Sequence, residues 1–399
     1  MSNADREAAL LASVDDALVL RLTEELIRIP GHQELPQQEA DKVRFLAGVL
    51  RREGIAVDLP EVEPGRPNLL ARLRGTGGGP TLLFNGHLDT IPAYDMADAF
   101  VPRYEGNRLY GRGAVDMLGA VAAMAAVLIQ CRRAGTALRG DLLLTAVVGE
   151  ENGSPGTYHL VQQGVKADFA VVGEATGMRV ALGHRGITWL EVTFNGVATH
   201  GSVPERGVNA VYHAGRFLRA VETELIPTLD ARRHPLLDRS TVNVGVIWGG
   251  TRPTMVPERC TIRLDRRWLP GETPASVRGE VQAILDRLAA ADPQFKAEVH
   301  EMPETSNFVH YPLECPADHP AAALLAAAVG DAAATGRQPV VGVQYWTDGA
   351  LLSHQGGIPT VVCGPGDIAQ AHSSAEYVGT DQLALAVRSY LLMALRYLA

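Results

Sequence analysis

The sequence predicts an α/β protein, with a mainly parallel sheet covered by helices and interrupted by a second domain with a different strand order. Three observations predict this fold. Helices and strands alternate up to about residue 183, a β-α-β-β-α-β order follows, and the alternation resumes after Pro303. The 399 residues leave room for two or three domains of roughly 150 residues each. We expect a discontinuous domain of residues 1–183 and 304–399, with residues 184–303 inserted into it.

The first part of the chain shows the periodicities of both element types. Apolar residues recur at helical spacing in Asp16–Ile29 and Gln38–Glu53. Met117–Arg133 is apolar nearly all round, which indicates a buried helix, and this pattern stops at Gly135, a typical residue after a helix end. The strands expected in this part are Leu69–Leu73, Thr81–Asn85, Asp141–Val148 and Phe169–Val172.

The order of elements changes at Ile187 and returns to the first pattern near the end of the chain. The middle part follows the split βαβ order of ferredoxin-like domains. Its expected elements are strand Ile187–Phe194, helix Asn209–Glu222, strands Val242–Trp248 and Cys260–Trp268, helix Pro274–Ala291 and strand Phe295–His300. The last part is expected to hold helix Ala321–Ala334, strands Val340–Val343 and Thr360–Val362, and helix Asp381–Tyr397.

Composition excludes several classes of partner. The chain has 36 Lys+Arg against 45 Asp+Glu, a net charge of −9, and no basic run longer than pairs such as Arg132-Arg133, so we expect no nucleic acid partner. The longest apolar run, Gly119–Ile129, is shorter than the ~20 residues of a membrane helix. The N-terminal segment is acidic and lacks the features of a signal peptide, and the four Cys are far apart. We therefore expect no membrane partner and a cytoplasmic location.

Histidines and carboxylates follow the expected strands where each strand ends. Ligands of open α/β sheets collect at the carboxyl ends of the strands, so these side chains are expected to share one edge of the sheet. Asp116 opens the buried helix and is expected at the same edge. The residues that follow strands are His87, Asp89, Glu150, Glu151, Glu174 and His372.

This group of side chains favours a metal site. The adjacent Glu150 and Glu151 would repel each other at the end of an apolar strand, and a divalent cation would remove that conflict. His and carboxylate ligands suit Zn²⁺, Co²⁺ or Mn²⁺, and Asp89 could support His87 from two residues away. Alternatively, a His after a strand simply bonds a backbone carbonyl and holds no metal. The sequence shows no complete dinucleotide loop, no Walker string and no Gly-x-Ser-x-Gly elbow.

Seven short strings carry a resemblance to a known family. The chain resembles the zinc-dependent amidohydrolases and exopeptidases that include acetylornithine deacetylase, succinyl-diaminopimelate desuccinylase, aminoacylase and glutamate carboxypeptidase. The resemblance covers nearly the whole chain, and it implies a metallopeptidase catalytic domain with an inserted lid and dimerisation domain. The strings are Gly86–Pro92, Gly111–Met117, Gly149–Gly153, Gly173–Thr176, Ala198–Ser202, Asp265–Arg267, and Gly364–Gly366 with Ala371-His372.

The resemblance implies roles for the residues of the outer domain. Asp116 would bridge two divalent metal ions, and zinc is the metal that the resemblance favours. Glu150 would be the general base, and Asp89 would orient the ring of His87. Glu at position 174, rather than Asp, is typical of the family's deacylases and carboxypeptidases. The implied ligand sets are His87, Asp116 and Glu174 for one ion, and Asp116, Glu151 and His372 for the other.

The resemblance also implies roles for three residues of the inserted domain. His200 would stabilise the oxyanion, reaching the partner subunit's site in a homodimer, and Arg267 would hold the substrate carboxylate through its planar guanidinium. Position 254 is Thr where many members have Asn, so contacts to the substrate there are expected to differ. Alternatively, His200 caps a loop, and Arg267 forms a surface ion pair with Asp265 or Glu258. Tyr345 and Trp346 line the substrate side or pack in a core.

These features predict a hydrolase that cleaves the amide bond of a small N-acylated amino acid. A metallo-carboxypeptidase or dipeptidase acting on short peptides is the alternative within the enzyme class. A binding protein that kept the fold without catalysis is a third possibility. The presence of Glu150 argues against it, because a structural metal needs ligands but no adjacent base.

Overall fold

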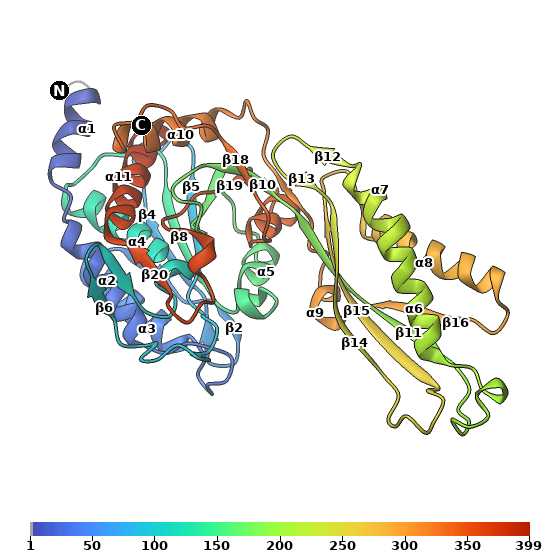
Figure 1. The fold of residues 1–399 in the computed structure, drawn as a ribbon. Helices are drawn as coiled ribbons and strands as arrows, with labels where there is room; N and C mark the ends of the chain where they lie inside the picture. The colour runs from blue at the N-terminus through green and yellow to red at the C-terminus, as the bar shows by residue number, and fades with distance from the viewer. Residues whose placement is uncertain (1–2) are drawn as a thin grey trace. The chain divides into compact units, whose positions relative to one another are not determined.

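The computed structural model describes residues 3–399, which form two compact units. The first unit consists of the chain up to Gly183 together with Leu313–Val343 and Thr347–Ala399. The second unit consists of His184–Pro312 and Gln344–Trp346. Figure 1 shows the elements of each unit.

The second unit continues past residue 303, where the sequence pattern placed its end. The main-chain N–H of Met302 donates to the carbonyl of Trp189 (2.8 Å), and Thr305 accepts a hydrogen bond from Trp189 N through its hydroxyl (3.0 Å). Ile187 N donates to the carbonyl of His310 (3.1 Å). The bonds of Thr305 and His310 tie the segment after residue 303 to the first strand of the second unit.

The first unit contains a nine-stranded sheet of mostly parallel central strands, which confirms the predicted α/β class. Four central strands are parallel neighbours in the order β8 (Leu142–Val147), β5 (Leu82–His87), β9 (Phe169–Val172) and β19 (Thr360–Val362). Every side chain of β5, β8 and β9 is buried, as expected for strands covered on both faces. The other strands of this sheet are β1 (Ala56–Asp58), β4 (Leu69–Leu73), β10 (Ala181–His184), β17 (Leu313–Glu314) and β18 (Val341–Val343).

The helix α4 (Gly119–Arg133) lies at the centre of the helical layer and packs against α2 (Asp16–Arg28) and α11 (Thr380–Tyr397). Ala114–Arg133 is long and apolar enough to cross a membrane by composition, but its apolar window is wholly buried, so it serves as a core helix. The regular helix begins at Gly119, two residues later than the sequence pattern predicts. The remaining elements are α1 (Asn3–Ala12), α3 (Ala40–Arg52), α5 (Pro155–Gln162), α10 (Pro320–Ala332), β2 (Glu61–Glu63), β3 (Arg66–Pro67), β6 (Arg103–Glu105), β7 (Arg108–Tyr110) and β20 (Tyr377–Gly379).

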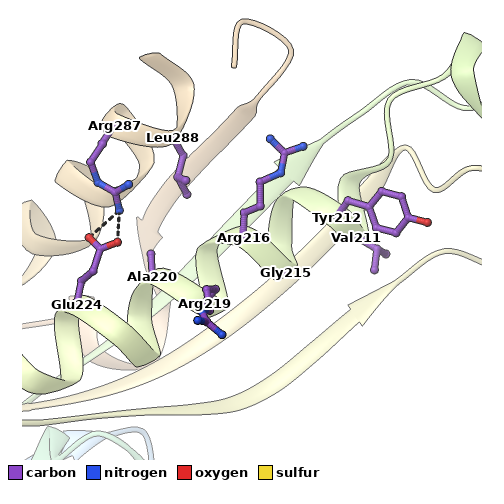
Figure 2. A pocket seen from close by; sticks show the side chains of 9 residues that line it. All are labelled: Val211, Tyr212, Gly215, Arg216, Arg219, Ala220, Glu224, Arg287 and Leu288. Atoms are coloured by element: carbon purple, nitrogen blue, oxygen red, sulfur yellow. Dashed lines mark hydrogen bonds and ion pairs between the residues drawn. The ribbon is translucent and has the colours of Figure 1, made fainter. Parts of the chain in front are cut away.

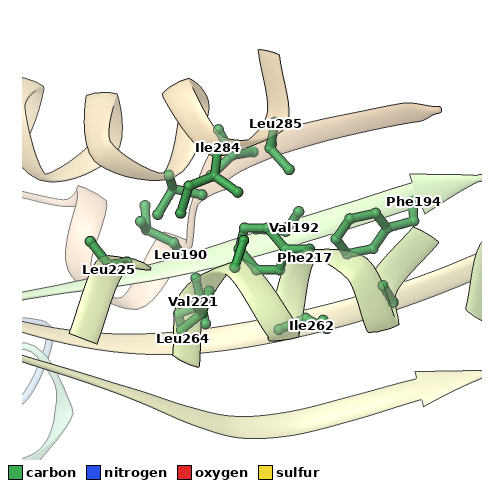
Figure 3. Close-up of a cluster of buried hydrophobic side chains, with 14 of the residues drawn as sticks. Leu190, Val192, Phe194, Phe217, Val221, Leu225, Ile262, Leu264, Ile284 and Leu285 are labelled. Carbon is green, nitrogen blue, oxygen red and sulfur yellow. The ribbon is translucent and has the colours of Figure 1, made fainter. Parts of the chain in front are cut away.

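The second unit is a four-stranded antiparallel sheet with helices on one face. The strand order is β14 (Thr241–Gly249), β15 (Arg259–Trp268), β11 (Gly186–Asn195) and β16 (Lys296–Glu301), as the βαββαβ pattern predicts. Alternate side chains of β11 and β15 pack against α6 (Ala210–Ala220) and α8 (Pro274–Ala291), and Figure 3 shows this core. The smaller elements are α7 (Ile226–Asp230), α9 (Pro303–Ser306), β12 (Arg233–His234) and β13 (Asp238–Arg239).

Candidate metal centre

Three neighbouring parallel strands bring predicted ligands to one edge of the large sheet. His87 is the last residue of β5, which lies between β8 and β9. Glu150 and Glu151 follow the end of β8, and Glu174 follows the end of β9. Parallel strands end at the same edge, so these side chains converge although they are far apart in the sequence.

Asp116 lies at the centre of the cluster, and each of its two carboxylate oxygens faces a different histidine. Oδ1 is 3.0 Å from Nε2 of His87, which is 3.3 Å from Oε1 of Glu174. Oδ2 is 3.2 Å from Nε2 of His372, which is 2.9 Å from Oε1 of Glu151. The structure therefore brings all five predicted ligands together, in two groups that share Asp116.

The donor atoms of this cluster fit divalent metal ions. One ligand atom from each of His87, Asp116 and Glu151 lies within 4.8 Å of the others, and the same holds for His87, Glu150 and Glu174. Imidazole nitrogens and carboxylate oxygens are ordinary ligands of Zn²⁺ and related ions. Glu150, predicted as the general base, is thus itself within ligand range.

The electrostatics of the cluster also favour a bound cation. Burial raises the pKa of Glu174 to about 7, with a further contribution from the charge of Asp116. Burial likewise raises the pKa of Glu150 well above its ordinary value, against the opposing effect of His87. Hydrogen bonds to Asp116 and Glu151 raise the pKa of His372 to about 10. The two histidines compensate only part of the negative charge of Asp116, Glu150, Glu151 and Glu174, and divalent ions would supply the rest.

The carboxylate of Asp89 lies closer to the loop that carries the two glutamates than to the ring of His87. Its two oxygens accept the main-chain N–H groups of Glu150 and Glu151, both at 3.0 Å. Nδ1 of His87 is 3.0 Å from the main-chain carbonyl of Asp89 and 3.5 Å from its carboxylate. The carbonyl is therefore the nearer partner of His87, and the carboxylate orients the Glu150–Glu151 backbone.

His200 and Thr254 belong to the second unit, where their segments run side by side. His200 forms an isolated antiparallel bridge with Met255, and Gly201 N donates to the carbonyl of Thr254 (2.7 Å). Nδ1 of the exposed His200 is 2.7 Å from the hydroxyl of Ser202 and accepts the N–H of Ser202 (3.2 Å). One ring nitrogen therefore closes the loop, while Nε2 points away from these bonds.

Arg267, also in the second unit, is a quarter exposed and forms a two-point ion pair with Asp265. Its Nε and Nη2 lie 2.9 and 3.0 Å from the two oxygens of that carboxylate. Trp346 packs near His310, with 4.8 Å between ring centroids, and its indole N–H donates to the carbonyl of Tyr311 (3.1 Å). Trp346 thus belongs to an aromatic cluster of the second unit.

Two groups of buried charge near the cluster are absent from the sequence prediction. Asp348 accepts a hydrogen bond from the hydroxyl of Thr157 (2.7 Å), and burial raises its pKa to about 6. Arg112 and Glu376 form a buried ion pair at 2.7 Å. For this ion pair, the sequence signals are an Arg between two glycines at 111–113 and a Glu four residues after His372. Neither pattern indicates a partner, because the pairing residues are distant in the chain.

Comparison with known proteins gives the same class. The model of peptidase family M20/M25/M40 matches residues 83–396. A deformylase of N-formyl-4-amino-5-aminomethyl-2-methylpyrimidine from Bacillus subtilis (strain 168) is 30% identical over 369 residues, covering 85% of each chain. Acetylornithine deacetylase from Myxococcus xanthus is 33% identical over 324 residues, covering 79% of this chain and 80% of the relative.

A solved structure extends the comparison of the fold. An aminopeptidase from Bacillus cereus ATCC 10987 superposes with a TM-score of 0.79 at 17% identity, covering 96% of this chain and 99% of that one. Together, the matches define a hydrolase that acts on C–N bonds. The chain belongs to peptidase family M20/M25/M40.

Proposed function

We propose that this protein hydrolyses the amide bond of a small N-acylated amino acid, as deacetylases, desuccinylases and aminoacylases do. The observation that carries the proposal is Asp116, whose two oxygens face His87 and His372, with Glu150 beside them. The similarity to a deacetylase and a deformylase, at 33% and 30% identity, supports an acyl group as the part removed.

Two sets of residues that share Asp116 would each hold one divalent ion. Zinc suits these donors best, and cobalt or manganese also fit. His87 and Glu174 complete one set, and Glu151 and His372 the other. When bound, such ions act as Lewis acids toward the amide carbonyl and lower the pKa of water toward ~7.

Glu150 would act as the general base. It takes a proton from the attacking water, whose oxygen forms the new C–O bond to the acyl carbon, and returns the proton to the nitrogen as the C–N bond breaks. The products are a carboxylic acid and a free amine. The hydrogen bond from Glu150 N to Asp89 (3.0 Å) fixes the backbone of this base.

Three residues of the second unit would bind the substrate. His200 would donate to the developing oxyanion through Nε2, because its Nδ1 is engaged by Ser202. Arg267 would exchange part of its pairing with Asp265 for the substrate carboxylate, and Thr254 would contact the acyl or carboxylate group. Replacing His200→Asn should lower kcat far more than it changes KM, whereas unchanged kcat would remove this role.

The inserted domain would also form a homodimer. β14 is an edge strand that exposes Val246, Ile247 and Trp248, each by 45–49%. On α6, Tyr212 is 69% exposed. A Cβ atom added at Gly215 would have no neighbouring atom within 4 Å. Figure 2 shows both residues beside a hollow. An exposed edge strand with apolar side chains can pair with a second copy. Sedimentation should show a dimer that Ile247→Lys weakens, and a monomeric native chain would contradict it.

A carboxypeptidase or dipeptidase acting on short peptides is the second candidate. Glu174 is in keeping with a carboxypeptidase, because the resemblance makes Glu at this position typical of carboxypeptidases as well as deacylases. Free-amine release distinguishes the two, using N-acetyl, N-succinyl and N-formyl amino acids beside short peptides. The assay includes added Zn²⁺ or Co²⁺ and a chelator control. Chelator-sensitive cleavage of one acyl class would support the deacylase, and cleavage of peptides alone would support the peptidase.

Substitution of the base tests the mechanism. Glu150→Gln keeps the size of the side chain but cannot take a proton, so metal content should stay at the native level while kcat falls by about 10²–10⁴-fold. Retained activity would show that another group is the base. Retained metal with no cleavage of any substrate by the native protein would favour a binding protein without catalysis.

A further inference from the structure

A buried ion pair connects the two chain segments that carry Asp116 and His372. The side chains of Arg112 and Glu376 are only 2% and 1% exposed, and Nη1 of Arg112 is 2.7 Å from Oε2 of Glu376. Arg112 lies four residues before Asp116, and Glu376 lies four residues after His372. The pair therefore joins segments that are about 260 residues apart in the sequence.

The carboxylate of Glu376 holds the backbone of Asp116. Its second oxygen, Oε1, accepts the main-chain N–H groups of Val115 (3.1 Å) and Asp116 (3.3 Å). The backbone of Asp116 is extended, with φ −127° and ψ 91°, and the regular helix starts only at Gly119. Glu376 thus provides the acceptor that these N–H groups would otherwise lack.

The guanidinium of Arg112 holds the backbone beside His372. Nη1 donates to the carbonyl of Ser373 (3.2 Å), the residue after His372. Nε and Nη2 donate to the carbonyls of Pro92 and Ala93, both at 3.2 Å. A planar guanidinium can reach these acceptors and Glu376 at once, which an ammonium group cannot do.

We propose that Arg112 and Glu376 are positioning residues that set the spacing between Asp116 and His372, and so control metal affinity at the set formed by Asp116, Glu151 and His372. This inference rests on the proposed function, because it needs the two ligand sets. Asp116 belongs to both sets, but His87 ends β5, Glu174 follows β9, and neither has a bond to the Arg112–Glu376 pair among the described residues. The set with His87 and Glu174 should therefore change less than the set with His372, whose neighbour Ser373 is also held by Arg112.

Cobalt binding to the metal-free protein tests the proposal. Co²⁺ is added stepwise to the native chain and to Glu376→Gln and Arg112→Lys, while visible absorption and bound metal are measured. Gln keeps an acceptor oxygen but turns an N–H₂ group toward Arg112, and Lys loses the fork. Both variants should bind the first ion within about threefold of the native affinity, and the second ion about 10–100-fold more weakly, with an altered spectrum.

A matched control separates positioning from general stability. Glu280→Gln removes a carboxylate partner of the buried Arg266 in the second unit, 3.1 Å from Nη2. This variant should lose thermal stability comparably yet keep both cobalt affinities and the native spectrum. If Glu376→Gln does not fold, Arg112→Lys, which preserves both charges, decides the question.

The outcomes separate the two proposals. Native protein that binds no ion would overturn the proposed function. Native protein that binds two ions, with variants of unchanged affinity and spectrum or with equal loss at both sets, would overturn only the positioning role.

Discussion

At the residue scale, the buried carboxylate of Asp89 supports the site by binding the backbone beside the ligand cluster. Its two oxygens accept the N–H groups of Glu150 and Glu151. Burial works to raise its pKa, but the hydrogen bond and charge of His87 and these N–H groups outweigh burial, so the pKa of Asp89 is lowered. The charged form is thus favoured where two backbone donors need an acceptor.

We predict that Asp89→Asn lowers kcat/KM by about 10–100-fold without unfolding the protein. An amide can accept one of the two N–H groups, but its N–H₂ group opposes the other, so the Glu150–Glu151 backbone loses a bond. Kinetics and thermal unfolding measure the two effects. Asp141→Asn is the matched control, because Asp141 accepts the N–H of Gly75 (2.9 Å) just before β8. Equal losses in both variants would contradict the prediction.

His310 predicts a pH dependence of stability in the second unit. Burial lowers its pKa from 6.5 to about 4. Between these values the unfolded chain binds a proton that the folded chain does not, so stability falls as pH falls from 6.5 toward 4. The shift corresponds to up to about 3 kcal/mol at 1.36 kcal/mol per unit.

His310→Phe should make this loss of stability shallower, because Phe can keep the packing against Phe308 (4.3 Å between ring centroids) and Trp346 without taking up a proton. Urea unfolding at about pH 7, 5.5 and 4.5 measures the difference. His300→Gln provides the control for the loss of a histidine as such, because the side chain of His300 is exposed. The same slope in His310→Phe as in the native chain would refute the assignment.

At the scale of elements, the stability of the second unit depends on the N-terminal cap of α8. Thr273 caps α8: its hydroxyl accepts the N–H of Ser276 (3.1 Å), and the Ser276 hydroxyl accepts the N–H of Thr273 (2.9 Å). This reciprocal pair satisfies two donors that the first turn leaves without partners.

Thr273→Ala should lower the free energy of unfolding by about 1 kcal/mol, because one N–H of the first turn loses its acceptor. Urea denaturation measures the change. Thr228→Ala removes a hydroxyl that bonds back to the carbonyl of Glu224, in the π-helical turn just before α7 (2.7 Å), and it should change stability by less than about 0.5 kcal/mol. Equal effects would show that the capping box contributes nothing specific.

At the scale of the whole molecule, the first unit carries every predicted metal ligand, so bound ions should stabilise it. An ion that binds only the folded chain adds about 2.7 kcal/mol at 100 times its Kd. Chelation should therefore lower Tm by several degrees and abolish turnover, and added Zn²⁺ should restore both. Calorimetry and activity assays with and without chelator measure this. An unchanged Tm, with metal loss verified, would contradict metal-linked stability.

Much of the site follows from the sequence because parallel strands end at one edge. His87, Glu150 and Glu174 each follow an apolar run, and this pattern alone predicts that they converge. The elements of the inserted domain are equally predictable from the sequence, since alternating apolar residues in β11 and apolar residues at helical spacing in α6 each define the buried face of their element. The family resemblance rests on these same local strings.

Other features depend on residues that meet only after folding. The start of α4 shifts to Gly119 while Glu376, some 260 residues away, accepts the N–H of Asp116. The carboxylate of Asp89 also bonds the Glu150–Glu151 backbone, whereas its spacing in the sequence suggested only the ring of His87 as a partner. Local periodicity reports which face of an element is buried, but the hydrogen-bond partner of a buried charge is chosen by whichever donor the tertiary packing brings within about 3 Å.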